Sequence, residues 1–201
     1  MIHLGYVALD FAQAYKDATR AMVGDQEEAD IDVLCDGHLW YDKHQGFIAS
    51  FLLYNLERMD GIEIRPQVSA SSLFPGSAAH ESEVAASLES GGLSEVMEAA
   101  LSAEMAVVGR VGRGPMRHAL NWSLAQRCTD RPVKAFFSMG PVQISAVVKD
   151  EHYRDRRALL RDLADIYHAE MVDAVAAGAT IVELDDLIFL APPEEWEFDV
   201  E

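Results

Sequence analysis

The feature that most constrains the fold of this chain is the alternation of short apolar runs with amphipathic helices. The runs are rich in Val, Ile, Leu and Phe and are expected as strands within 31–37, 106–114, 131–145 and 180–186. Segments with helical periodicity lie around them, at 8–29, 44–59, 93–105, 115–128 and 153–177. Non-alternating apolar strands separated by helices indicate parallel βαβ units. The sequence therefore predicts an α/β protein, and both a doubly wound sheet and a barrel fit this order.

Composition and charge narrow the class of protein. The chain has 201 residues, of which 50% are hydrophobic, and a net charge of −18. Because nucleic acids and anionic membranes are polyanions, this charge disfavours both as partners. The two cysteines, Cys35 and Cys128, suggest free thiols in a reducing compartment. With no apolar run of ~18 residues to span a bilayer and no signal-peptide pattern at the N-terminus, we expect a soluble cytoplasmic protein.

The clearest helix is the one predicted at 153–177, directly before the last strand. Its predicted buried face comprises Leu159, Leu163, Ile166, Met171 and Val175. Gly178 follows as a natural C-cap, because glycine readily adopts the left-handed conformation that ends many helices. By contrast, 61–105 contains an extended arm limited by Pro66 and a stretch rich in Ser, Gly and Ala. We expect one partial domain over 1–201, with 61–105 as an excursion or insertion.

Polar groups follow three of the predicted strands, where α/β folds commonly place their sites. They are Asp36 and His38, then Lys134 leading to Gly140 and Pro141, then Asp185 and Asp186. Residues held at strand ends are rigid enough to be aimed at a ligand. The alternative is structural, because aspartate also caps helices.

Two further patterns concern metal and anion binding. Cys35 and His38 have the spacing C-x-x-H, but no second ligand cluster follows, so no metal site is expected in this chain alone. The turn GRVGRG at 109–114 places Arg110 and Arg113 beside glycines, where they could hold an anion. A basic surface turn is the alternative for this segment.

Taken together, three segments resemble the cobalamin-independent methionine synthase barrel. The first is GDQEEADIDVLCDGHLWYDKHQGFIASFLLYNLERMDGIE, which is similar to the early helix and Asp-Gly strand of that family. RPVKAFFSMGPVQIS resembles the strand that ends in Gly-Pro. YRDRRALLRDLADIYHAEMVDAVAAGATIVELDD resembles the long helix and the strand that ends in Asp-Glu-Pro. These segments cover about half of the chain in the family's order.

The resemblance implies a (β/α)₈ barrel related also to uroporphyrinogen decarboxylases, here only partial. It also implies a zinc-bound thiol that accepts a methyl group, with Asp185 or Asp186 holding the ammonium group of the substrate. The departures from the family are that its first strand has no clear counterpart and that the strands bearing its zinc ligands are absent. An incomplete barrel leaves open sheet edges, so we expect a second chain, or a second copy, to complete it. Zinc would belong to that assembled complex.

Three functions remain open from the sequence. The first is a subunit of a methionine-synthase-like alkyl or methyl transferase, with Asp185 and Asp186 as catalytic candidates. Its predicted substrate contacts are Asp36, His38, Arg110, Lys134, Gly140 and Pro141. The second is a non-catalytic binding or scaffold protein degenerated from that family. The third is a metal-free lyase or decarboxylase that uses its carboxylates as acid–base groups.

Overall fold

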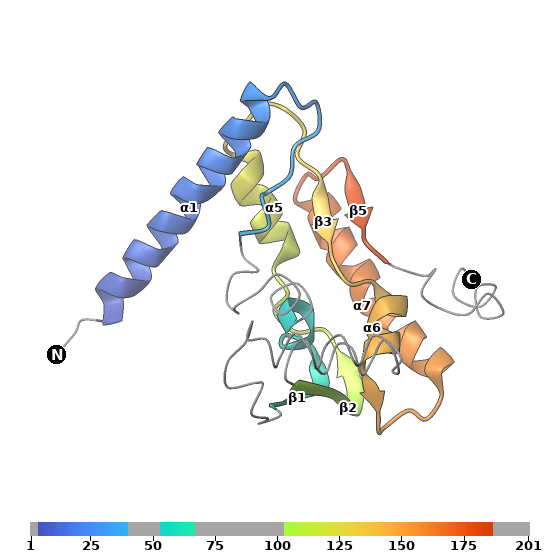
Figure 1. Ribbon diagram of the computed structural model, residues 1–201. Coiled ribbons are helices and arrows are strands. Elements are labelled where there is room, and N and C mark those ends of the chain that lie inside the picture. The colour runs from blue at the N-terminus through green and yellow to red at the C-terminus, as the bar shows by residue number, and fades with distance from the viewer. Residues whose placement is uncertain (1–3, 40–52, 67–102, 187–201) are drawn as a thin grey trace, which may run out of the picture. The chain divides into compact units, whose positions relative to one another are not determined.

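The computed structural model describes residues 4–39, 53–66 and 103–186 (Figure 1). The chain divides into two compact units. Unit 1 consists of Met1–Lys43, Arg117–Phe137 and Ala169–Glu183, and unit 2 of His44–Met116, Ser138–His168 and Leu184–Glu201. Each unit combines helices with strands. None of the helices in the described ranges is long and apolar enough to cross a membrane.

Unit 1 is built around a short run of neighbouring strand segments. Leu34 forms a parallel bridge with Val133, and β3 (Ala135–Phe137) pairs on its other side with β5 (Val182–Leu184). The unit also holds α1 (Leu4–Glu28), α5 (His118–Gln126) and the last turns of α7 (Arg156–Ala176).

Helix α5 packs against β3. Alternate residues of a strand point to opposite faces, so the helix covers only one face of β3. On the covered face, Val133, Ala135 and Phe137 are buried. Trp122 of α5 donates a 2.8 Å hydrogen bond from Nε1 to the carbonyl oxygen of Val133. Lys134 and Phe136 lie on the opposite face and are only half-buried.

Unit 2 contains the sheet β1–β2–β4. Strand β1 (Asp60–Pro66) pairs antiparallel with β2 (Ala103–Gly112), and β4 (Lys149–Asp150) pairs parallel with β2. Helix α6 (Pro141–Val147) and the first turns of α7 belong to the same unit. The described residues therefore form a mixed α/β fold with parallel pairing, as predicted, but no closed barrel is seen among them.

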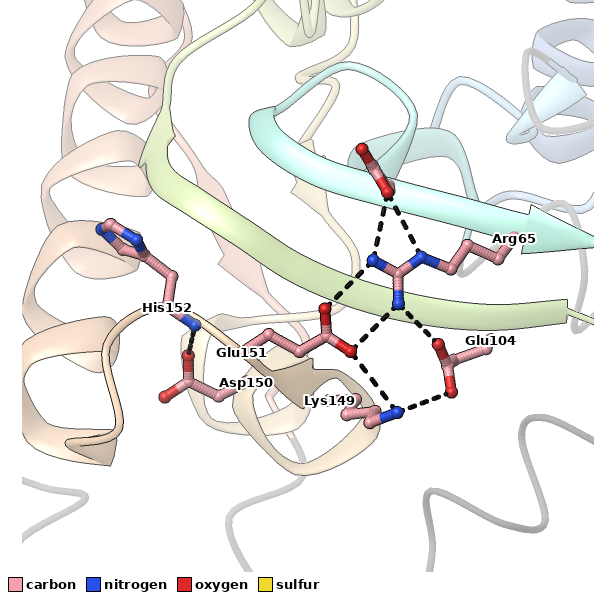
Figure 2. Close-up of polar contacts among 7 residues, drawn as sticks. Arg65, Glu104, Lys149, Asp150, Glu151 and His152 are labelled. Atoms are coloured by element: carbon pink, nitrogen blue, oxygen red, sulfur yellow. Dashed lines mark hydrogen bonds and ion pairs between the residues drawn. The ribbon is translucent and has the colours of Figure 1, made fainter.

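An ion-pair network joins the three strands of this sheet (Figure 2). The guanidinium of Arg65 on β1 forms an ion pair with Glu63. Its Nη1 atom lies 2.9 Å from Oε1 of Glu104 on β2 and 3.0 Å from Oε1 of Glu151. Lys149 of β4 lies 3.1 Å from Glu104. Hydrogen bonds from Arg65 lower the pKa of both Glu104 and Glu151. All these groups are partly exposed, so the network aligns the strand ends and contributes little stability by itself.

Several predicted boundaries are corrected by the structure. Only Leu34 of the expected strand 31–37 is paired, and 103–105 begin β2 although a helix was predicted there. Helix α6 and strand β4 were not foreseen in the sequence. The predicted helix 44–59 is described only from residue 53, and helical backbone there spans 53–56. Residues 67–102 lie outside the described ranges.

The long helix α7 is confirmed, but its buried face is rotated from the predicted one. Leu159, Leu163 and Ile166 are buried as expected, whereas Val175 is 56% exposed. Glu170 and Ala174 are buried further along the helix. A straight helix repeats every 3.6 residues, so the stripe that starts at Leu159 reaches position 174 and not 175. Gly178, with φ +114°, ends the helix as predicted.

Candidate functional site

In unit 1, the face of β3 opposite α5 carries a cluster of charged and aromatic side chains. Lys134 Nζ lies 2.6 Å from Glu183 Oε2 of β5, and the two side chains are 28% and 43% exposed. His38 stacks on Phe136, with ring centroids 4.3 Å apart and planes inclined by 20°. We call Asp36, His38, Lys134, Phe136 and Glu183 the Lys134 cluster. Three neighbouring strand segments contribute to it.

A tight turn holds His38 against Phe136. Gly37 has φ +76° and His38 itself has φ +53°, a conformation uncommon for a residue with a side chain. The carboxylate of Asp36 stabilises the turn by accepting a 3.0 Å hydrogen bond from the backbone N–H of His38. Asp36 Oδ1 also lies 3.6 Å from His38 Nε2. A Cβ at Gly37 would lie 3.0 Å from Cβ of Met22, so this glycine also lets the turn approach α1.

The environment of the cluster favours a neutral imidazole at His38. Burial lowers the pKa of His38 below its ordinary value of 6.5, and the charge of Lys134 acts in the same direction. Asp36 and Glu183 oppose this shift, but their combined effect is smaller than that of burial and Lys134. The cluster therefore combines the Lys134–Glu183 ion pair with an uncharged imidazole that lies on an aromatic ring.

In unit 2, Asp186 and Gly140 form the start of α6. The two carboxylate oxygens of Asp186 accept hydrogen bonds from the backbone N–H groups of Val142 (3.0 Å) and Gln143 (2.9 Å). Gly140 donates its N–H to the carbonyl oxygen of Asp185 at 2.9 Å. Pro141 occupies the first turn of the helix, where a missing N–H costs nothing. Asp186 thus fills the capping role that the sequence left open for it.

A buried polar network, which the sequence did not indicate, holds the loop before Gly140. Asn55 donates from Nδ2 to the carbonyl oxygen of Ser138 at 2.6 Å and to the hydroxyl of Tyr167 at 3.1 Å. Tyr167 in turn donates to the carbonyl oxygens of Ser138 and Met139. Met139 has φ +55°, so these contacts fix a backbone conformation that is costly for methionine. The only available signal was a lone Asn between apolar residues.

Arg110 lies in a separate part of unit 2. Its guanidinium makes two hydrogen bonds to Asp162 of α7, at 2.9 and 3.1 Å. Tyr153 donates a 2.5 Å hydrogen bond to the same carboxylate and accepts one from the N–H of Val111. These bonds lower the pKa of Asp162 and raise that of Arg110. Arg110 therefore links β2 to α7 through its hydrogen bonds to Asp162.

The predicted site residues thus fall into separate groups. Asp36, His38 and Lys134 come together in unit 1, where the sequence missed Phe136 and Glu183. Gly140, Pro141, Asp185 and Asp186 meet in unit 2, as expected for the ends of the chain segments 131–145 and 180–186. An acidic residue inside the apolar run TIVEL was the available signal for Glu183. Within the described residues, no group of three or more His, Cys, Asp or Glu side chains could hold a metal ion.

Comparison with known proteins shows a partial similarity of fold. No protein-family model matches the chain, and no curated protein matches it. A solved structure of a B12-independent methionine synthase from Shewanella sp. W3-18-1, in complex with selenomethionine, matches with a TM-score of 0.58 and 23% identity. The match covers 88% of this chain and 42% of that chain. The resemblance predicted from the sequence is therefore confirmed for the fold: this chain is similar to part of a methionine synthase structure and spans less than half its length.

Proposed function

We propose that this chain is the substrate-binding subunit of a methionine-synthase-like methyl or alkyl transferase, and that its substrate is a thiol-containing amino acid. The proposal is supported by the fold similarity and by the Lys134 cluster. An amino acid carries one ammonium and one carboxylate, and the cluster holds the complementary charges on one face. Lys134 binds the carboxylate and Glu183 attracts the ammonium, each exchanging its contact with the other for a contact with the substrate. The half-exposed His38–Phe136 stack offers an apolar wall for the side chain.

The described residues do not fit a zinc site, so the proposal derives no step through zinc. The residues of this chain bind and orient the substrate. The metal that the sequence resemblance implies is assigned to the assembled complex, with ligands from a partner.

A charge-removing substitution tests the Lys134 cluster. We expect Lys134→Met to weaken binding of L-homocysteine or L-methionine by 10-fold or more in isothermal titration calorimetry, because the carboxylate loses its ammonium partner. Lys149→Met is the matched control, since Lys149 is also paired with a glutamate but lies in the sheet of unit 2. Equal binding by both variants and the unaltered protein contradicts the assignment.

The two aspartates of unit 2 are tested separately from the Lys134 cluster. Both carboxylate oxygens of Asp186 are engaged with α6, so within unit 2 we assign ligand contact to the half-buried Asp185. Asp185→Asn should cost about 2–4 kcal/mol of binding free energy for a ligand whose cationic group meets this charge in a desolvated setting. Asp186→Asn should reduce the stability of the fold by about 1 kcal/mol, because it weakens the cap.

A non-catalytic scaffold is the second candidate function. It is favoured by the intramolecular engagement of Arg110 and Asp186, two residues predicted to meet a ligand. Failure of the chain, alone and with any partner, to bind amino acids would support it over the transferase proposal.

A further inference from the structure

The Lys134–Glu183 ion pair occupies the position that a charged ligand of the Lys134 cluster would take. Lys134 Nζ lies 2.6 Å from Glu183 Oε2, and the two side chains are 28% and 43% exposed. A small ligand can therefore reach both groups. A ligand that binds one of these charges has to share it with the other residue of the pair or displace that residue. The ion pair thus competes with every charged ligand at this cluster.

The backbone keeps the two residues of the pair beside each other. The N–H of Lys134 donates a 2.9 Å hydrogen bond to the carbonyl oxygen of Leu34, and the N–H of Ala135 donates one to that of Ile181, also at 2.9 Å. Strand β3 pairs with β5, which contains Glu183. Because these backbone segments are hydrogen-bonded, the ion pair opens by movement of its side chains, and the two charges remain neighbours after it has opened.

A ligand with a single charge leaves one member of the opened pair without a partner. A carboxylate bound by Lys134 lies beside the carboxylate of Glu183, and like charges at short range repel. An amine bound by Glu183 likewise lies beside the ammonium of Lys134. Both residues are partly buried, and their charges act on His38 in the stack with Phe136, so water screens these interactions less than on an open surface. Repulsion therefore offsets part of the affinity of a single-charge ligand.

A zwitterionic ligand avoids this cost because it supplies both of the missing charges. Its carboxylate replaces Glu183 at Lys134, and its ammonium replaces Lys134 at Glu183. Each charge then has a partner both before and after binding. A contact of 2.6 Å is exchanged most easily by a ligand whose two charges lie close together, as they do in an α-amino acid.

We propose that the Lys134–Glu183 pair determines the specificity of this site, because it admits zwitterionic amino acids and rejects ligands that carry only a carboxylate or only an ammonium. The inference rests on the proposed function, since it takes the Lys134 cluster as the amino-acid site. It adds that Glu183 acts against carboxylate ligands and that Lys134 acts against amines. Removing either residue should therefore improve the binding of one class of ligand.

The first test compares three ligands on the unaltered chain by isothermal titration calorimetry. They are L-methionine, its deamino analogue, which keeps the carboxylate, and its decarboxylated amine, which keeps the ammonium. All three have the same thioether side chain, so only the charges differ. We expect each analogue to bind about 10-fold or more weakly than L-methionine, as for the loss of a close charge pair.

Substitutions separate this competition from the simple loss of a contact. In Glu183→Gln, the deamino analogue should bind about 5-fold or more tightly than to the unaltered chain, because Lys134 has lost its internal carboxylate partner. L-methionine should bind more weakly to the same variant. Lys134→Met should give the converse result, with tighter binding of the decarboxylated amine. Glu104→Gln is the matched control, since it removes an acceptor of Lys149 in unit 2 and should leave all three affinities unchanged.

Two results would overturn the inference and leave the proposed function intact. In the first, the unaltered chain binds L-methionine and both analogues equally well. In the second, neither analogue gains affinity when its internal competitor is removed from a variant whose thermal melt shows that it is folded. Failure of L-methionine itself to bind would contradict the proposed function, and this inference with it, so the two failures are distinguishable. The comparison of ligands on the unaltered chain needs no variant to fold.

Discussion

At the scale of single residues, unit 1 contains a buried pair of polar side chains, His118 and Glu170. His118 and Glu170 are 2% and 3% exposed, and His118 Nδ1 lies 2.9 Å from Glu170 Oε2. The imidazole also packs on Phe137, with ring centroids 4.6 Å apart. The pair joins the first residue of α5 to α7. Burying either member without its partner is expensive, so it specifies how these two helices meet.

Glu170→Ala should therefore destabilise the protein by about 3–5 kcal/mol, because it removes the carboxylate beside a buried imidazole and leaves a void. Glu170→Gln preserves the shape and an acceptor oxygen, and should cost less than half as much. Urea unfolding followed by circular dichroism measures both. If Gln and Ala prove equally costly, charge and not the hydrogen bond dominates this pair.

His38 makes a second prediction, which concerns pH. Because burial lowers its folded-state pKa below 6.5, the unfolded chain binds a proton at His38 before the folded chain does as the pH falls. The stability from this residue is fully present above about pH 6.5 and is lost as the pH falls through the folded-state pKa. We expect His38→Gln to reduce the loss of stability between pH 7.5 and 5.

Thermal melts across this pH range test the prediction, with His152→Gln as the control, since His152 is exposed. The control should retain the pH dependence of the unaltered protein. If the melting temperature of His38→Gln falls with pH as steeply as that of the unaltered protein, groups other than His38 control stability in this range.

At the scale of secondary-structure elements, sequence periodicity predicted long helices well and short elements poorly. Helix α7 was predicted because 21 residues repeat the apolar pattern often enough to define it. The seven-residue α6 begins at Pro141, directly after Gly140, and the pair Gly140-Pro141 is equally typical of the end of a strand. The two residues of β4 carry no pattern at all, and only pairing with β2 makes them a strand. The predicted Lys134 lies directly before β3 and not after a strand, and its partner Glu183 could not be predicted because the pairing of β3 with β5 is not visible in the sequence.

Helix α6 depends on the absence of a side chain at Gly140. Its φ of −61° suits any residue, but a Cβ would lie 2.3 Å from Cγ of Asp186. Gly140→Ala should displace the Asp186 cap and destabilise the protein by about 1–3 kcal/mol. In an Asp186→Gly background the same substitution should cost much less, because the cap and the Cβ of Asp186, which would lie 2.4 Å from the new Cβ, have both gone.

Gly109→Ala is the control for this cycle. A Cβ at Gly109 would have its nearest neighbour at 3.7 Å, an ordinary contact, so little destabilisation is expected. Chemical denaturation of the four variants measures the coupling between positions 140 and 186. Additive effects would mean that Gly140 is needed for a reason other than the cap.

At the scale of the whole molecule, charge is the property that the sequence gives most directly. The chain has 34 acidic and 16 basic residues, which produces its net charge of −18. The ion pairs described in unit 2 use few of the acidic groups, and they are exposed enough for salt to screen them. Most of the negative charge therefore acts as repulsion within the folded chain. The resemblance read from the sequence predicted part of a barrel fold. Neither the sequence pattern nor the predicted order of helices and strands indicated that this chain divides into two units.

Salt should consequently stabilise this protein. Between 10 and 150 mM NaCl at pH 7, screening weakens the repulsion among excess carboxylates more than it weakens the few exposed ion pairs, each of which contributes about 0–1 kcal/mol. We expect the melting temperature in scanning calorimetry to rise over this range. Arg65→Met removes the arginine at the centre of the network in Figure 2 and makes the net charge of the chain one unit more negative. The melting temperature of this variant should therefore rise more steeply with salt. A melting temperature that falls with salt in the unaltered protein would mean that local ion pairs outweigh the net charge.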